Sequence, residues 1–126
     1  MSSPNQENLS KIARKSKAFQ RLEQNLTKDL LWIWVLSLLQ EGPKYAYELR
    51  NEIQERYGFS PATVTNYTIL YLLREEGIVK KTEMRNDVER IDRKYYAITE
   101  LGEKLLEEAE KYLKEIYLKL YPSAEL

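Results

Sequence analysis

Apolar residues recur every three or four positions along several long stretches of the chain, which is the spacing of one face of an α-helix. Over residues 7–26 this pattern is interleaved with basic side chains and predicts a single amphipathic helix. Residues 30–39 are apolar at all but one position, so a second helix, capped by Thr27, is predicted to be buried on all sides. Gly42 and Pro43 end it, because glycine permits a left-handed exit and proline cannot continue the hydrogen-bond ladder.

Two further helices are predicted on either side of Gly58. The first covers about residues 46–57, has one apolar face and ends at the glycine. Ser60 and Pro61 predict the start of the second, residues 60–76, because a serine hydroxyl caps free amides and proline is preset for the first helical position. Its apolar stripe is Val64, Tyr67, Leu70 and Leu73, which leaves Thr63, Thr65, Asn66 and Thr68 on or near the solvent-facing side.

The last third of the chain changes character after Gly77. Residues 78–84 and 88–98 are rich in β-branched and aromatic side chains and predict a β-hairpin around a loop at residues 85–87. A final helix, residues 99–120 with its cap at Thr99, would be about 33 Å long, more than a small core can cover. Part of it is therefore expected to pack on another chain, along the heptad positions Leu106, Ala109, Leu113, Ile116 and Leu120.

Helices followed by a β-hairpin, with a short turn before the last helix of the set, form a winged helix-turn-helix, in which the hairpin is the wing. The predicted fold class is mainly α with a small β-hairpin, extended by an N-terminal helix and a long C-terminal dimerisation helix. The expected domains are a basic helical arm over residues 1–28, a winged-helix DNA-binding domain over residues 29–98 and a dimerisation helix over residues 99–126.

Composition excludes much chemistry. The 126 residues include neither cysteine nor histidine, so disulfides, thiol nucleophiles and the commonest general base and metal ligand are all missing. No catalytic constellation and no glycine-rich phosphate loop is present, and no enzymatic activity, cofactor or metal is expected. The longest apolar run is about half of what a membrane-spanning helix needs, and the N-terminus does not resemble a secretory signal, so a cytoplasmic protein is expected.

The 20 basic and 20 acidic residues balance overall but not locally. Residues 1–28 hold six basic and two acidic side chains, whereas residues 99–126 hold four lysines and seven glutamates. Three interpretations of the basic arm stay open: an additional contact with DNA, attraction to the acidic final helix of a dimer, or simple solvation. The opposite charges of the two ends favour the second.

In a winged helix-turn-helix, the last helix of the set presents its N-terminal residues to base edges in the major groove. Asn66 can pair with adenine, and Thr63 and Thr65 can donate to bases or phosphates. Arg85 and Asn86 at the tip of the wing suit the adjacent minor groove. The expected DNA contacts are Lys44, Tyr45, Ser60, Thr63, Thr65, Asn66, Tyr67, Lys80, Lys81, Arg85, Asn86, Arg90 and Lys94.

Three stretches resemble the PadR-type transcriptional regulators. Residues 38–49 are similar to the family's leucine pair, Gly-Pro and Gly-Tyr-Glu-Ile run, with Ala46 where the family usually has glycine. Residues 67–78 place Tyr, Leu, Leu and Gly at the spacing of the family's recognition helix. Residues 93–102 resemble its wing strand and the Tyr-Tyr-x-Ile-Thr-Glu-x-Gly entry into the final helix.

The resemblance implies a homodimeric repressor whose recognition helices and wings straddle a pseudo-palindromic operator. Two departures stand out: the family's multi-helix C-terminal domain is reduced to one helix, and the basic N-terminal helix is an addition that can embrace the partner subunit. The expected dimer contacts are Phe19, Leu22, Leu26, Leu106, Ala109, Leu113, Ile116, Tyr117 and Leu120.

Two alternatives stay open at this stage. A neutral charge balance also suits a winged-helix module that docks other proteins without binding DNA, and a polar helix face or a basic wing can be merely solvated. Trp32 and Trp34 lie about 200° apart around their helix, so one can face the core and the other the flanking helices. A small aromatic effector at the dimer seam would use such residues, although buried aromatics need no ligand to explain them.

Overall fold

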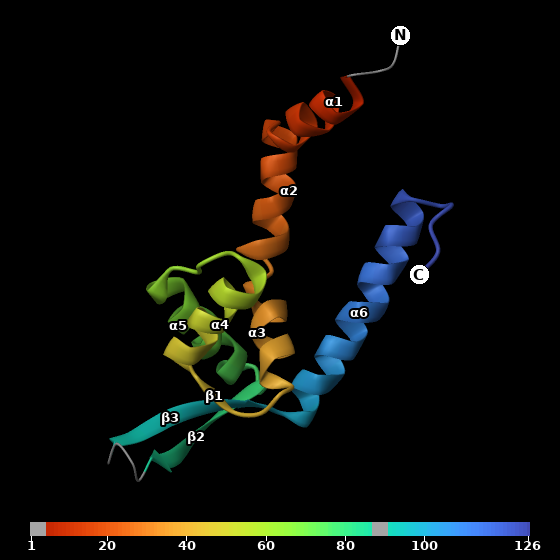
Figure 1. Cartoon of the computed structure of the whole chain (residues 1–126). Coiled ribbons are helices and arrows are strands. Elements are labelled where there is room, and N and C mark those ends of the chain that lie inside the picture. The colour runs from red at the N-terminus through yellow and green to blue at the C-terminus, as the bar shows by residue number, and fades with distance from the viewer. Residues whose placement is uncertain (1–4, 87–90) are drawn as a thin grey trace.

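The computed structural model describes residues 5–86 and 91–126, with side chains throughout except at residues 83–86 and 91–93. Its helices and strands follow the predicted order (Figure 1). They are α1 (Asn5–Arg14), α2 (Lys17–Thr27), α3 (Leu31–Leu39), β1 (Lys44–Tyr45), α4 (Ala46–Tyr57), α5 (Thr63–Glu75), β2 (Val79–Asn86), β3 (Ile91–Ile98) and α6 (Glu100–Leu120).

The N-terminal segment forms two helices, so the prediction of one continuous helix over residues 7–26 was wrong. The break lies at Ser16, whose extended backbone ends the helical path and whose hydroxyl oxygen accepts a hydrogen bond of 3.1 Å from the Phe19 amide. A serine with this geometry caps α2, because its side chain replaces the missing backbone acceptor. We call α1 and α2 together the arm.

Thr27 was predicted to cap the next helix, but it does not. It is the last residue of α2, and its hydroxyl donates a hydrogen bond of 2.6 Å to the carbonyl of Glu23 one turn earlier. Helix α3 begins after Leu30 without a side-chain cap among the described residues. Burial stabilises α3 instead, since an all-round apolar helix gains more from packing than from its ends.

Helix α3 lies at the centre of the core, as predicted. Its buried leucines and Val35 pack against Leu49 and Ile53 of α4 and against Leu70 and Leu73 of α5. The remaining core residues come from the start of α4, from the segment after α5 and from β3: Ala46, Ile78, Val79 and Tyr96. Three helices closed on one side by a small sheet form a winged helix, which confirms the predicted fold class.

The sheet has three antiparallel strands in the order β1-β3-β2. The predicted hairpin is confirmed, and its strands pair from Val79 opposite Ile98 outward. Strand β1 was not predicted, because two residues are too short for an alternating pattern to be read. It pairs with β3 through Lys44 opposite Tyr96 and Tyr45 opposite Tyr95, and so joins the start of α4 to the wing.

Ser60 and Pro61 were predicted to start helix α5. The helix instead begins at Thr63, with Ala62 in the N-cap position. Pro61 is buried, and its carbonyl accepts a hydrogen bond of 2.8 Å from Nε of Arg50 in α4. The proline is therefore used to fasten the turn between α4 and α5 onto α4.

Helix α6 starts as predicted, with the Thr99 hydroxyl oxygen accepting from the Gly102 amide at 3.1 Å. Beyond its first turns the helix extends away from the winged helix, and Gly102 is its one buried residue (Figure 1). Among the described residues, no helix is long and apolar enough to cross a membrane, and no group of side chains suited to holding a metal ion was found.

Candidate nucleic-acid interface

The first two turns of α5 present a small, polar face to solvent. Thr63, Thr65 and Thr68 are exposed, and Tyr67 is 52 % exposed. Within the described chain, no side chain caps the N-terminus of α5 at Ala62. The first backbone amides of a helix that lacks such a cap remain available to an anion, which the helix dipole also attracts.

Asn66 does not belong to this face, so its predicted position on the solvent side was wrong. Its side chain is 1 % exposed, and its Nδ2 donates a hydrogen bond of 3.0 Å to the carbonyl of Ala46 at the start of α4. Helix α5 is therefore rotated relative to the predicted stripe, with Asn66, Leu70 and Leu73 inside and Val64 and Tyr67 outside. Asn66 joins two helices and is not free to read a base.

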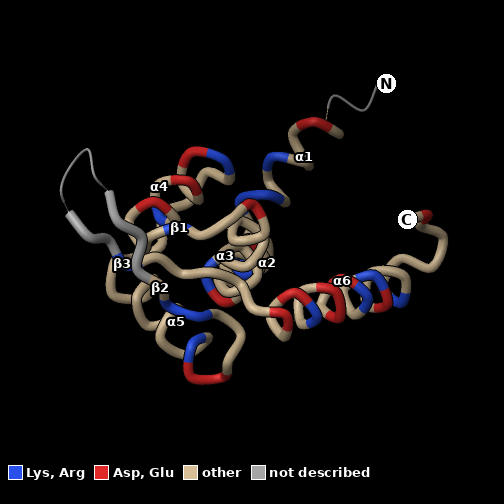
Figure 2. Tube along the Cα trace, turned by 90° about the horizontal axis from the view of Figure 1, so that it is seen from below, with Lys and Arg blue, Asp and Glu red and all other residues tan. Residues whose placement is uncertain are grey.

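A cleft of about 270 Å³ lies beside α5, where the start of α4 meets the wing. Exposed Lys81 of β2 and Lys94 of β3 supply its positive charge, and four tyrosines supply the rest of its polar lining. Figure 2 shows the basic stretch of β2 next to α5. Ammonium and phenol groups together suit a phosphate oxygen. The tyrosines are Tyr45, Tyr47, Tyr67 and Tyr96.

The tyrosines of this cleft are held by packing. The ring of Tyr45 meets that of Tyr95 edge-on, with centroids 5.5 Å apart. Lys81 lies over the Tyr96 ring, with its Nζ 5.9 Å from the centroid. Burial, with a smaller contribution from nearby Tyr67, raises the pKa of Tyr96, so that its hydroxyl stays protonated. Tyr47, which is 61 % exposed, was missed by the sequence analysis because nothing marked the first turn of α4 as part of this surface.

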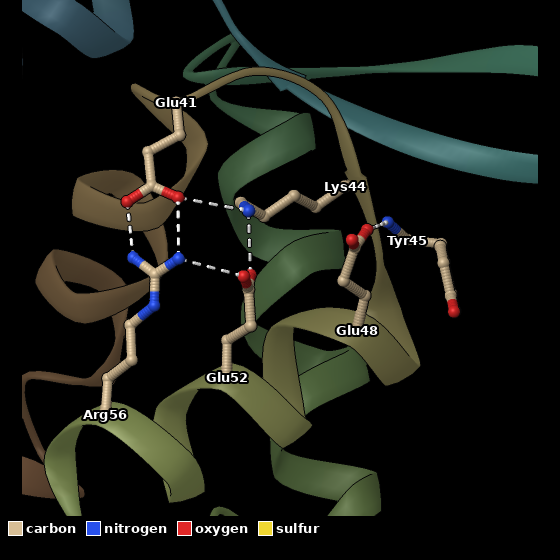
Figure 3. Close-up of polar contacts among 6 residues, drawn as sticks. All are labelled: Glu41, Lys44, Tyr45, Glu48, Glu52 and Arg56. Atoms are coloured by element: carbon tan, nitrogen blue, oxygen red, sulfur yellow. Dashed lines mark hydrogen bonds and ion pairs between the residues drawn. The ribbon is translucent and has the colours of Figure 1, made fainter.

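Lys44 was predicted to contact DNA, but the structure buries it, and that placement was wrong. Its Nζ lies 2.8 Å from Oε2 of Glu52 and 3.2 Å from Oε1 of Glu41 (Figure 3). Burial alone would lower the pKa of Lys44, but hydrogen bonds to the two carboxylates raise it above its ordinary value. The lysine therefore serves as an internal cation at the root of the wing.

Arg56 completes this ion cluster. Its guanidinium makes two hydrogen bonds to the carboxylate of Glu41, and its Nη2 also lies 3.1 Å from Oε1 of Glu52 (Figure 3). The hydrogen bond from Arg56, followed by that from Lys44, holds the pKa of Glu41 below its ordinary value. The cluster links the segment after α3, strand β1 and the later turns of helix α4.

The lowered pKa of Glu41 makes the stability of the fold depend on pH. A carboxyl whose pKa is lower in the folded state stabilises it above the unfolded pKa and loses this contribution as the pH falls through the folded value. We therefore expect the urea midpoint of unfolding to fall below about pH 4.5 more steeply in the wild type than in Glu41→Gln. Glu55→Gln on the outer face of α4 is the control. Equal slopes in wild type and Glu41→Gln would contradict the role of the cluster.

Of the remaining predicted DNA contacts, some are exposed on the described surface and others lie outside the described residues. Ser60 is exposed in the loop before α5, and Lys80 is exposed on β2. The side chains of Arg85 and Asn86 lie outside the described residues, as does Arg90; only the backbone of the first two is seen, at the outer end of β2. The described surface therefore consists of the α5 face and the lysine cleft.

The profile of the Transcriptional regulator PadR-like family matches residues 35–108, more than half of the chain. The chain belongs to this family. The match begins within α3, so the arm lies outside it, as does the second half of α6. PadR-like proteins are transcriptional regulators.

Solved structures agree with this assignment. A transcriptional regulator from Clostridium thermocellum is 21 % identical, with a TM-score of 0.66 over 80 % of this chain and 99 % of the other. A PadR-like transcription factor from Bacteroides fragilis is 24 % identical, with a TM-score of 0.67 over 82 % and 99 %. A PadR family regulator from Eggerthella lenta is 25 % identical, with a TM-score of 0.62 over 86 % and 100 %. No curated protein matched the sequence.

In this PadR-like chain, four of the nine expected dimer residues border a groove between α3 and α6. The groove measures about 790 Å³ and includes Leu106, Ala109, Leu113 and Tyr117 of α6. Ile116 and Leu120 lie farther around the same helix. Phe19, Leu22 and Leu26 lie on α2.

The two tryptophans pack against different parts of the protein, as predicted. Trp34 stacks against Tyr57 and Phe59, with ring centroids 4.6 and 5.4 Å away, and its Nε1 donates to the carbonyl of Leu26 at 2.8 Å. Trp32 packs against the core and borders an apolar hollow of about 350 Å³ between α3, α5 and α6. Protein contacts account for the position of Trp34 without a ligand.

Proposed function

We propose that this PadR-like regulator is a homodimeric DNA-binding repressor that places α5 in the major groove and rests its wing on the backbone. One observation carries the proposal: the exposed face of α5 adjoins the lysine cleft, because Tyr67 of that face also lines the cleft. This surface combines side chains that reach base edges with cations that neutralise phosphates.

The roles follow from position. Thr63 and Thr65 lie in the first turn of α5, where a recognition helix meets base edges, and their hydroxyls donate to or accept from bases. The uncapped amides of the same turn receive a phosphate oxygen. Lys81 and Lys94, with Tyr67 between α5 and the wing, hold the neighbouring phosphate. Lys80 adds charge along the wing.

The proposed dimer is formed through α6. Its C-terminal half exposes large apolar side chains, including Leu113 at 42 % and Leu120 at 69 %, which a monomer would leave in water. A two-fold axis would then present two α5 helices to half-sites about one helical turn of DNA apart, so that the operator is a pseudo-palindrome. A dimer bound at a promoter represses by occupying it.

Selection from random duplex DNA tests the proposal. The full chain should enrich a two-fold symmetric sequence, and fluorescence anisotropy should show binding to it that survives excess nonspecific DNA and falls steeply with salt. A chain that enriches no sequence and binds all duplexes equally weakly would overturn the proposal and favour a winged-helix module that docks proteins instead.

A further inference from the structure

The arm has no cover in a single subunit. Neither α1 nor α2 contains a buried residue, and Leu9, Ile12, Leu22 and Leu26 are each between 45 and 65 % exposed. Figure 1 shows α2 separating from α6 of the same chain as both leave the domain, with α1 bent toward the side of α6. Apolar side chains that remain in water raise the free energy of the single subunit. We therefore expect the apolar face of the arm to pack against a partner.

The base of the arm is fixed. The hydrogen bond from Trp34 to the carbonyl of Leu26 joins the last turn of α2 to α3, and the rings of Tyr57 and Phe59 hold Trp34 in place. The arm therefore leaves the domain in a defined direction and presents the side chains of Phe19, Leu22 and Leu26 along one edge of α2.

Helix α6 has more apolar surface than one partner helix can cover. At 100° per residue, the side chains from Tyr112 to Tyr121 spread their apolar members over about two-thirds of the helix circumference. A single helix packed against α6 covers an apolar stripe of about 100°. Pairing of α6 with α6 of the second subunit therefore leaves another stripe exposed. The apolar members are Tyr112, Leu113, Ile116, Tyr117, Leu118, Leu120 and Tyr121.

The stripe on the α3 side forms the wall of the groove described above. Ile33 of α3 and Leu106, Leu113 and Tyr117 of α6 make it apolar. Three glutamates and one lysine also border it, which gives it a negative charge. The arm is strongly basic, with six lysines and arginines against two glutamates over residues 1–28. The charged residues of the groove are Glu103, Glu107, Glu110 and Lys114.

We propose that the arm of each subunit lies in the α3–α6 groove of a second copy of this chain, in a reciprocal exchange that completes the proposed dimer. The two surfaces match in apolar character and carry opposite charge. The arm and the outer half of α6 both lie outside the residues shared with the family. The inference rests on the proposed homodimer and adds the surface that receives the arm.

Disulfide cross-linking between two chains tests the exchange. The sequence contains no cysteine, so only the introduced cysteines can form a disulfide. Leu22→Cys on a tagged chain and Lys114→Cys on an untagged chain are mixed, allowed to exchange subunits and oxidised. The expected product is a covalent heterodimer on a denaturing gel, because a disulfide needs Cα atoms within about 7 Å. Matched controls place the cysteines on the opposite sides of the same helices, at Gln24→Cys and Glu108→Cys.

Sedimentation separates this proposal from the one that it rests on. A dimeric wild type in which the Leu22 and Lys114 cysteines link no better than the controls would overturn arm exchange while leaving the dimer in place. A monomeric wild type would overturn both. As a second measurement, Leu22→Glu should weaken dimerisation by about tenfold or more, whereas Gln24→Glu, with the same charge on the other side of α2, should leave it nearly unchanged. Equal dissociation constants for the two variants would also overturn arm exchange.

Discussion

Replacement of Gly102 by alanine is expected to destabilise the fold by about 3 kcal/mol, the upper range of overpacking in a tight interior. A Cβ at this position would lie 2.3 Å from the carbonyl oxygen of Ile78 and 2.7 Å from Cγ1 of Ile98. The Ile78 carbonyl cannot withdraw easily, because the backbone amide of Thr99 donates to it at 3.1 Å and the Thr99 hydroxyl oxygen lies 2.9 Å away. The higher helix propensity of alanine, worth about 1 kcal/mol, offsets only part of this cost.

Chemical denaturation of the purified variant measures the effect. Glu103→Ala changes the neighbouring exposed position of α6 and should alter the free energy of unfolding by no more than about 0.5 kcal/mol. A Gly102→Ala variant as stable as the wild type would show that α6 can move away from the sheet without loss.

Reversal of both lysines in the cleft, Lys81→Glu with Lys94→Glu, is expected to reduce DNA affinity by about 100-fold or more at moderate salt. Each ammonium would lose a charge-assisted phosphate contact worth about 1.5–3 kcal/mol. The slope of log affinity against log salt concentration should also become shallower by about two, because each phosphate that is no longer neutralised retains its counterion. The loss should be similar for all DNA sequences, since phosphate contacts position the protein without reading bases.

Anisotropy titrations over a series of salt concentrations give both quantities. Lys111→Glu with Lys119→Glu makes the same change in net charge on α6, away from the cleft, and should leave the salt slope unchanged. If the two double variants lose affinity equally, bulk charge rather than the cleft determines DNA binding. Unfolding midpoints of both variants confirm that the fold is intact.

The order of the elements could be predicted from the sequence because periodicity reports which side of each helix is buried. The apolar run of α3, the glycine that ends α4 and the two strands of the wing all leave strong local signals. Ser16 left a weaker one: the apolar spacing continues across it, and only the geometry of its cap ends α1.

The rotation of α5 could not be predicted for a different reason. An analysis based on apolar spacing places every asparagine side chain at the surface. Asn66 is nevertheless buried, because its Nδ2 donates a hydrogen bond to the Ala46 carbonyl. Lys44 misled in the same way, since a lysine is expected in water unless its partners are known, and Glu41 and Glu52 are supplied by segments before and after it. Buried polar groups depend on tertiary partners, which local sequence does not reveal.

The close approach of Gly102 to Ile78 also joins the wing to the axis of α6. Since 21 residues make a lever of about 32 Å, a tilt of about 10° at its root would move the far end by about 6 Å, nearly two base-pair steps of DNA. In the proposed dimer, the tight contact between Gly102 and Ile78 therefore fixes the angle of α6 and, through it, the distance between the two DNA half-sites. Operators with altered spacing would be tolerated first by chains in which this contact had loosened.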